Sequence, residues 1–292
     1  CAAFIGQLSE LGNGWAIPCA TDIAFSYLVA RFVFGAGHPA IPFLLLLAIA
    51  DDAIGLIILA VFYPQGDVNI TYMLLPVVGI LLGKVMQKQG IKSFWPYLLL
   101  PGSLSWVGFA LSGLHPALGL LPIIPVMPHA HSDIGFFNWD ELQRTDTLNQ
   151  FEHWWKNPVE IILGLFGLLN AGVVFEAIGD ATWLVLIGLL IGKPLGIWLC
   201  GMFAAKTLKF GFPEGMGSKE LFVVGCAAGI GFTVSLFVAT VAFRPGDIQD
   251  AAKMGALGSF AAVFMTIGIA KMLKVAKIEG DPDAEGHGHG SH

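Results

Sequence analysis

Four ionisable side chains lie inside segments of the sequence that are otherwise apolar. Asp51 and Asp52 are adjacent in FLLLLAIADDAIGLIILAVF, Lys193 lies in LVLIGLLIGKPLGIWL, and Asp22 lies in WAIPCATDIAFSYL. Placing the charge of one such residue deep in a membrane costs about 3 kcal/mol or more. A lone carboxyl group could stay neutral and bond to a backbone carbonyl, but an adjacent acidic pair together with a lysine indicates a functional site.

The charges of Asp51, Asp52 and Lys193 sum to −1 when all three are ionised. Adjacent side chains on a helix point about 100° apart, so one aspartate can face the lysine while the other faces a water-filled cavity. Because uncompensated buried charge is costly, the site is expected to take up a cation or a proton. Carboxylate oxygens suit a small, hard cation, and the sequence has no cluster of thiolates or imidazoles that suggests a transition metal.

Asp22 lies where the helical pattern is interrupted. Pro18 removes a backbone donor, and the side chains of Thr21 and Asp22 can bond to the groups that a break leaves free. A second weak point is VGCAAGIGFTVSLF (224–237), where three glycines precede Thr233. Two interrupted helices in separate halves of a transporter indicate an ion site near the membrane midplane, although glycines that serve only helix packing would explain the second break equally well.

The composition predicts a protein whose solvent is largely lipid. Hydrophobic residues make up 55% of the chain and charged residues 12%, and the mean hydropathy is +0.74. A soluble domain of this size could not hide so much apolar surface from water. A membrane-spanning helix needs about 20 apolar residues. Nine segments are candidates, two of them short: 15–34, 39–63, 69–87, 94–111, 114–127, 157–178, 181–204, 219–243 and 252–275.

The sequence therefore predicts one all-α membrane domain over residues 1–278, with a polar loop over about 128–156 and a disordered, His- and Gly-rich tail over 279–292. If the nine segments alternate in direction, twelve of the 15 Lys and Arg residues fall on one side, Arg244 and Lys253 fall on the other, and Lys193 lies within a span. This bias predicts that the C-terminus and the 128–156 loop are cytoplasmic. The four cysteines show no metal-binding spacing, and no basic patch for nucleic acid is present.

Seven stretches together resemble the NhaA family of Na⁺/H⁺ antiporters, and the similarity covers nearly the whole chain. They are GWAIPCATDIAF (14–25), LAIADDAIGLII (47–58), FEHWW (151–155), NAGV (170–173), GLLIGKPLGI (188–197), PEG (213–215) and GIGFTVSLF (229–237). The resemblance implies a helical bundle of twelve spans with inverted repeats and discontinuous, crossing helices. Because the chain starts at Cys1 and shows nine candidate spans, we expect three spans to be missing at its N-terminus and this fragment alone to be inactive.

The resemblance also implies roles for the residues that match the family's motifs. Asp52 would bind the cation and the proton, and Asp51 would form an ion pair with Lys193 that breaks as the site changes protonation. Thr21 and Asp22 would lie at the crossing of two broken helices. There, Asp22 would offset the positive helix ends and Lys193 the negative ones.

Glu152 and His153 match the family's cytoplasmic region that responds to pH. The sequence departs from the family nearby, where Trp155, Lys156 and Asn157 stand in place of the usual histidine–proline.

The function implied is the exchange of Na⁺ or Li⁺ for H⁺ across the bacterial inner membrane, for pH and sodium homeostasis. No cofactor and no enzyme activity are expected. The expected partners are the lipid bilayer and the transported ions. A homodimer is a further expectation, and no nucleic-acid partner is expected. Two alternatives stay open: an intramembrane aspartyl protease, in which Asp22 would have to pair with one of the two adjacent aspartates, and a homologue that does not transport.

Overall fold

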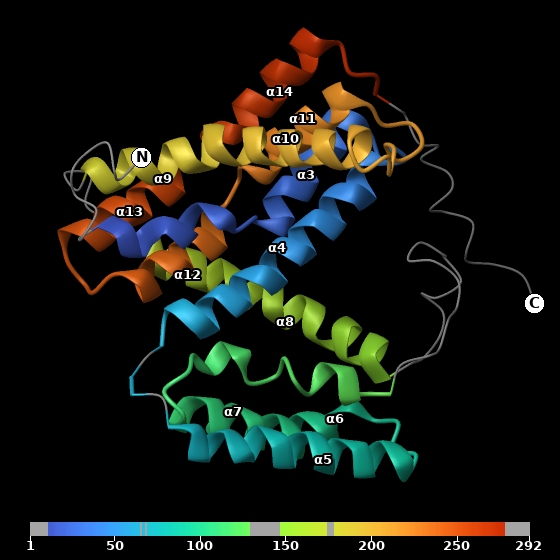
Figure 1. Cartoon of the computed structure of the whole chain (residues 1–292), viewed down its shortest axis with the longest axis vertical. Coiled ribbons are helices and arrows are strands. Elements are labelled where there is room, and N and C mark those ends of the chain that lie inside the picture. The colour runs from blue at the N-terminus through green and yellow to red at the C-terminus, as the bar shows by residue number, and fades with distance from the viewer. Residues whose placement is uncertain (1–10, 65, 68, 129–146, 174–177, 278–292) are drawn as a thin grey trace, which may run out of the picture. The chain divides into compact units, whose positions relative to one another are not determined.

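The computed structural model describes residues 11–64, 66–67, 69–128, 147–173 and 178–277, and every regular element within them is a helix (Figure 1). This confirms the all-α, membrane-type fold. The tail predicted over 279–292 lies outside the described residues, and so does most of the 128–156 loop. The chain divides into two compact units, Cys1–Gly55 with Phe166–His292, and Leu56–Leu165. The single domain over 1–278 therefore stays a prediction.

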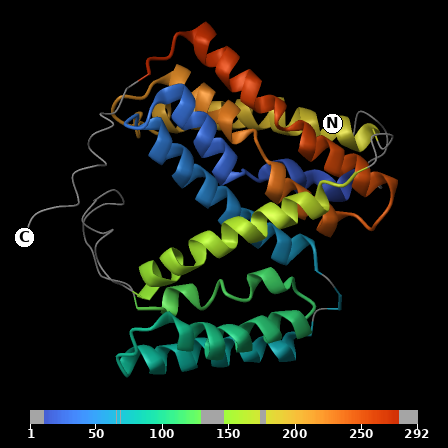
Figure 2. The same ribbon diagram turned by 180° about the vertical axis from the view of Figure 1, so that it is seen from behind.

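The first unit contains the helices that carry the four membrane charges. They are the 3₁₀ helix η1 (Gly12–Cys19), α3 (Ile23–Phe34), the first part of α4 (Ala40–Phe62), the end of α8 (Thr147–Asn170), α9 (Asp180–Ile187), the π-helical turn η8 (Gly188–Gly192), α10 (Lys193–Lys206), α11 (Ser218–Ala228), α12 (Phe232–Ala242), α13 (Asp247–Gly258) and α14 (Ala261–Leu273). Figures 1 and 2 show α10 running alongside α11, and these two helices share an extensive contact.

The second unit is built around two neighbouring helices, α5 and α7. Its elements are η2 (Ile70–Met73), α5 (Leu74–Lys88), α6 (Phe94–Tyr97), the π turn η3 (Leu98–Gly102), α7 (Ser103–Leu111), η4 (Pro116–Leu118), η5 (Ile124–Val126) and most of α8. Both views show α5 and α7 side by side. None of the four membrane charges lies in this unit.

Within the described residues, five helices are long and apolar enough to cross a membrane: Ala40–Phe62, Ile70–Lys88, Phe94–Leu111, Asp180–Lys206 and Asp247–Leu273. Two further pairs qualify if each is one bent span. Gly12–Cys19 meets Ile23–Phe34 at 44°, and Ser218–Ala228 meets Phe232–Ala242 at 53°. All seven coincide with predicted segments, and both bends fall where the sequence indicated interrupted helices.

Two predictions about the polar and proline-rich region were wrong. Residues 114–127 do not form an α-helix but the 3₁₀ turns η4 and η5 joined by further turns, because Pro116, Pro122 and Pro125 lack the N–H groups that a helix needs. The 128–156 segment is not a loop throughout, since α8 begins at Thr147. The Thr147 hydroxyl donates to the Lys92 carbonyl at 2.6 Å, and polar residues are as compatible with an exposed helix as with a loop.

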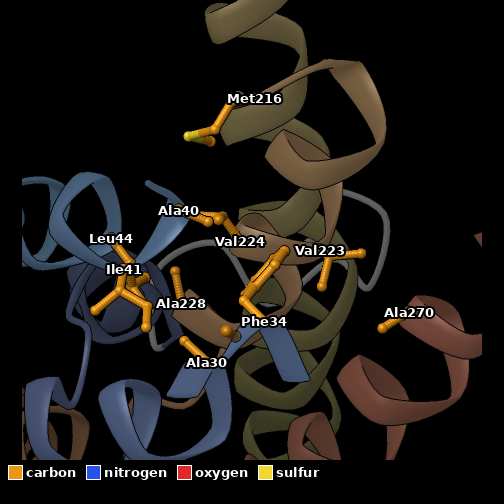
Figure 3. Packing of buried hydrophobic residues seen from close by; sticks show 11 residues of the cluster. Ala30, Phe34, Ala40, Ile41, Leu44, Met216, Val223, Val224, Ala228 and Ala270 are labelled. Atoms are coloured by element: carbon orange, nitrogen blue, oxygen red, sulfur yellow. The ribbon is translucent and has the colours of Figure 1, made fainter. Parts of the chain in front are cut away.

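A hydrophobic cluster in the first unit ties the start of α4 to α3 and α11 (Figure 3). Its buried members are Ala30 and Phe34 from α3, Ala40, Ile41 and Leu44 from α4, Val223, Val224, Ala227 and Ala228 from α11, Met216 before α11, and Ala270 from α14. Five of the eleven buried members are alanines, and small side chains let helix backbones approach closely, as membrane helices generally require.

Glycines bring α11 against the helix that carries Lys193. A Cβ atom added at Gly229 would lie 2.7 Å from the Leu189 carbonyl oxygen, and one added at Gly225 would lie 3.0 Å from the Pro194 carbonyl oxygen. These neighbours are backbone atoms, which cannot rotate away as a flexible side chain can. The glycines of 224–237 therefore serve helix packing as well as the break.

Gly229→Ala is expected to destabilise the protein by about 1–3 kcal/mol, because the new methyl group overlaps a backbone oxygen. The matched control is Gly196→Ala in α10, where an added Cβ meets nothing within 4 Å. Thermal stability in detergent, followed by size-exclusion chromatography after heating, compares the two variants. Equal melting temperatures for both variants would contradict the close approach of α11 to η8.

Candidate ion site

Two broken helices cross in the first unit. The first break is the extended segment Ala20–Asp22 between η1 and α3, and the second is Gly229–Gly231 between α11 and α12. The two breaks are joined directly, because the Asp22 backbone N–H donates to the Ile230 carbonyl at 2.7 Å. The crossing therefore satisfies part of its own free backbone, which is essential where no water is available.

The Asp22 carboxylate lies at the N-termini of both α3 and α12. One oxygen, Oδ1, accepts the Phe25 N–H at 3.2 Å in the first turn of α3. The other oxygen, Oδ2, accepts the Thr233 N–H at 3.1 Å and the Thr233 hydroxyl at 2.6 Å in the first turn of α12. Only 3% of Asp22 is exposed. A buried negative charge that meets two positive helix ends and three donors is well compensated.

The Lys193 ammonium group has an acceptor for each of its three hydrogens. It lies 3.2 Å from Asp51 Oδ2, 2.6 Å from the Thr21 hydroxyl oxygen and 2.8 Å from the Cys19 carbonyl oxygen. The Lys193 side chain is 7% exposed and that of Asp51 22%. Cys19 is the last residue of η1, so the lysine also lies at the carbonyl end of the first broken helix.

Thr21 links the two charges. Its hydroxyl accepts from Lys193 and donates to Asp51 Oδ2 at 2.7 Å, so it forms a hydrogen-bonded bridge between the lysine and the aspartate. Of the two adjacent aspartates, Asp51 is therefore the one in contact with the lysine.

Asp52 differs from its neighbour in one respect. Its Oδ1 atom is buried, and no hydrogen-bond partner for that atom is present among the described residues. Burial of a carboxylate oxygen without a partner is costly, which makes this atom the group at the crossing best suited to receive a proton or a cation. No group of three or more His, Cys, Asp or Glu side chains that could hold a metal ion occurs in the described part of the chain.

The two residues proposed for a pH response lie elsewhere. His153 is exposed on α8, in the part of that helix that belongs to the second unit. The backbone of Glu152 is in the same helix, and its side chain lies outside the described residues.

Three features of the site were not predicted from the sequence. The Cys19 carbonyl is a backbone group, so no side-chain pattern indicates it. The π turn Gly188–Gly192 precedes Lys193, and an added Cβ at Gly188 would lie 2.8 Å from Pro18 Cβ, so the lysine helix closely approaches the first broken helix. The contact between Thr233 and Asp22 had a signal, a polar residue directly after a glycine-rich break, but its partner is 211 residues away.

Comparison with known proteins assigns the chain to a family. The profile described as "Na+/H+ antiporter 1" matches residues 2–270. The chain belongs to this family of antiporters. The family and the apolar helices together establish a multi-pass membrane protein.

Curated relatives agree with the family. The Na(+)/H(+) antiporter NhaA of Jannaschia sp. (strain CCS1) is 56% identical over 300 aligned positions, which cover 95% of this chain and 71% of the relative. NhaA 2 of Pelobacter propionicus is 49% identical, with coverage of 94% and 72%, and NhaA of Geobacter sulfurreducens is 49% identical, with coverage of 92% and 71%. These matches support a transporter and lend no support to an intramembrane protease.

Thr233→Val is expected to lower the stability of this antiporter by about 1.5–3 kcal/mol, because it removes a hydrogen bond to a buried charge. Thr233→Ser retains the hydroxyl and should retain most of the stability. Thr240→Val is the matched control, because that hydroxyl in the same helix donates to the Phe237 carbonyl and to no charge. Thermal unfolding in detergent ranks the three variants. A Thr233→Val protein as stable as the serine variant would argue against the bridge.

Proposed function

We propose that this antiporter exchanges Na⁺ or Li⁺ for H⁺ at Asp52, with Asp51 and Lys193 forming the ion pair that accompanies each change of occupancy. The observation that carries the proposal is the contrast between the two aspartates. One oxygen of Asp51 contacts both Lys193 and Thr21, whereas the buried Oδ1 atom of Asp52 has no hydrogen-bond partner within the described part of the chain. Carboxylate oxygens bind both protons and small, hard cations, so one group can exchange one for the other.

Charge balance explains why the two ions bind in turn. Asp22 is compensated by two helix ends, and Asp51 by Lys193, so Asp52 is left as the uncompensated charge of the site. Binding of either a proton or Na⁺ restores neutrality, and binding of both would leave an excess positive charge in a medium of low dielectric. The two ions therefore exclude one another at Asp52.

The proton gradient drives the exchange in this proposal. Each conformational change carries the site with one ion bound, because an empty, charged carboxylate would be costly to move across the membrane interior. The interrupted helices supply the polar backbone groups that line such a site in transporters. No resident cofactor takes part, since Na⁺, Li⁺ and H⁺ are the cargo.

We place the antiporter in the bacterial inner membrane, where sodium/proton exchange serves pH and sodium homeostasis. The excess of Lys and Arg on one side of the predicted spans supports a cytoplasmic C-terminus. The pH-response roles of Glu152 and His153, and a homodimer, remain predictions of the family resemblance.

Asp52→Asn in the full-length antiporter is expected to abolish exchange, because the amide can neither release a proton nor supply a negative charge to Na⁺. Everted membrane vesicles with a fluorescent pH probe measure the sodium-evoked collapse of a proton gradient. Asp250→Asn on α13 is the matched control, because its carboxylate is 39% exposed and 4.0 Å from Lys253. Full sodium-evoked dequenching in the Asp52 variant would end the proposal.

Proton competition gives a second expectation for the wild type. Lowering the pH should raise the half-saturating sodium concentration, by up to about tenfold per pH unit once the protonated carboxyl predominates. The same vesicle assay, run over a sodium series at each pH, measures it. A half-saturating concentration that stays flat from pH 8.5 to 6.5 would show that the two ions do not share a site.

A further inference from the structure

A buried histidine fixes the first turn of the helix that carries Asp51 and Asp52. His38 precedes α4 by two residues, and its Nδ1 atom accepts the backbone N–H of Ala40, the first residue of that helix, at 3.1 Å. The His38 carbonyl accepts the next amide, that of Ile41, at 3.0 Å. The first N–H groups of a helix have no partner within the helix, so His38 satisfies two of them with one residue.

The imidazole ring is enclosed by three segments of the first unit. Only 4% of His38 is exposed, and its ring centroid lies 4.8 Å from that of Phe34 at the end of α3. The adjoining Pro39 packs against Gly215, where an added Cβ would lie 3.1 Å from Pro39 Cγ. The Glu220 carboxylate of α11 is the charged group that acts on the ring within the described part of the chain. Its Oε2 atom already accepts the Gly217 N–H at 2.8 Å.

The fold favours the neutral form of this histidine. Burial lowers the pKa of the His38 imidazole below its usual value near 6.5, and the Glu220 charge offsets only part of that effect. The hydrogen bond has the same preference, because Nδ1 can accept the Ala40 N–H only while it carries no proton. The stability that His38 contributes is therefore present above its usual pKa and is lost as the pH falls below it.

The start of α4 is also the part of that helix packed against α11. Ala40, Ile41 and Leu44 share a buried cluster with Val223 and Val224 of α11, as Figure 3 shows. Further along the same two helices are the aspartates on α4 and the break at Gly229–Gly231 after α11. The first turn of α4 is therefore connected to both parts of the candidate site, through α4 itself and through its packing against α11.

We propose that His38 is an acid-sensitive latch, whose neutral imidazole holds the first turn of α4 and whose protonation releases it and lowers the maximal rate of exchange. Protonation removes the acceptor of the Ala40 N–H and places a positive charge in an enclosed position. The helix that carries Asp51 and Asp52 then loses its fixed start. The latch rests on the proposed function, but it differs from proton competition at Asp52, which raises the half-saturating sodium concentration and leaves the maximal rate unchanged.

The chain contains a matched control for this latch. His115, Pro116 and Ala117 repeat the sequence of His38, Pro39 and Ala40, and His115 Nδ1 accepts the Ala117 N–H at 3.2 Å. Burial also lowers the pKa of His115. This second histidine heads η4, a three-residue 3₁₀ turn in the second unit, and not the helix of the aspartates. Variants of His115 therefore show the effect of losing a histidine cap at a site away from α4.

The test compares His38→Asn and His115→Asn in the full-length antiporter reconstituted into liposomes. Asparagine can accept the same amide two residues on, but it does not titrate. At saturating sodium, the wild type and His115→Asn should lose maximal rate between pH 7.5 and 5.5. At pH 5.5 the maximal rate of His38→Asn should be about 2- to 30-fold higher than that of the wild type, which is the range expected from one cap hydrogen bond. An equal loss of maximal rate in His38→Asn and wild type would overturn the latch.

A second measurement keeps the latch separate from the transport proposal. Hydrogen exchange of the peptide covering residues 38–46, corrected for the intrinsic effect of pH, should rise in the wild type below pH 6 and stay constant in His38→Asn. His38→Ser, with a smaller acceptor, replaces the asparagine variant if that protein fails to fold. Protection that falls equally in variant and wild type would refute the latch even in a protein that transports. If wild-type liposomes show no sodium-driven proton flux, the proposed function fails, and the exchange data still decide the latch.

Discussion

The ammonium group of Lys193 is the charge on which the candidate site depends. A lysine buried this deeply would be unstable without compensation, and its three hydrogens meet the Asp51 carboxylate of α4, the Cys19 carbonyl at the end of η1 and the Thr21 hydroxyl in the break that follows. Each of these acceptors needs a particular local structure: α4 must run straight through Asp51, η1 must end at Cys19, and the chain must be extended around Thr21. The compensation of this one cation therefore involves both the first helix break and one of the two adjacent aspartates, Asp51.

The two crossing helices solve the complementary problem for backbone groups. An interrupted helix inside a membrane exposes amides at one side of the break and carbonyls at the other, and neither can be left to lipid. Here the Asp22 carboxylate accepts amide hydrogens at the starts of α3 and α12, the second halves of the two broken helices. Lys193 donates to a carbonyl at the end of η1, the first half of one of them. The glycines of α11 have a separate role, since they allow the second break to lie against the backbone of η8. Packing and charge compensation thus depend on the same short segments.

Much of this arrangement could be predicted from the sequence, and the failures have physical reasons. Charged residues in apolar segments are so costly that their positions alone indicated the site, and proline and glycine indicated both breaks. The choice of Asp51 over Asp52 as the partner of Lys193 did not follow from the residues, because it depends on how α4 is rotated about its axis. The partner of Thr233 was missed because hydrogen bonds between distant segments leave no periodic signal. Residues 114–127 were apolar enough for a helix, and only the spacing of their prolines argued against it. The polarity of 147–156 was mistaken for a loop, although polarity reports exposure and says little about backbone conformation.

The position of Asp22 restricts how the bundle can move. The Asp22 carboxylate accepts hydrogen bonds from the second halves of both interrupted helices, and the backbone N–H of Asp22 donates to the carbonyl of Ile230. To slide one half-helix past the other, the molecule would have to give up several bonds at once in a place where water cannot replace them. The crossing should consequently travel as one stiff piece. Access to the two sides of the membrane would then change by movement of the whole crossing relative to the helices around it, and not by movement within it.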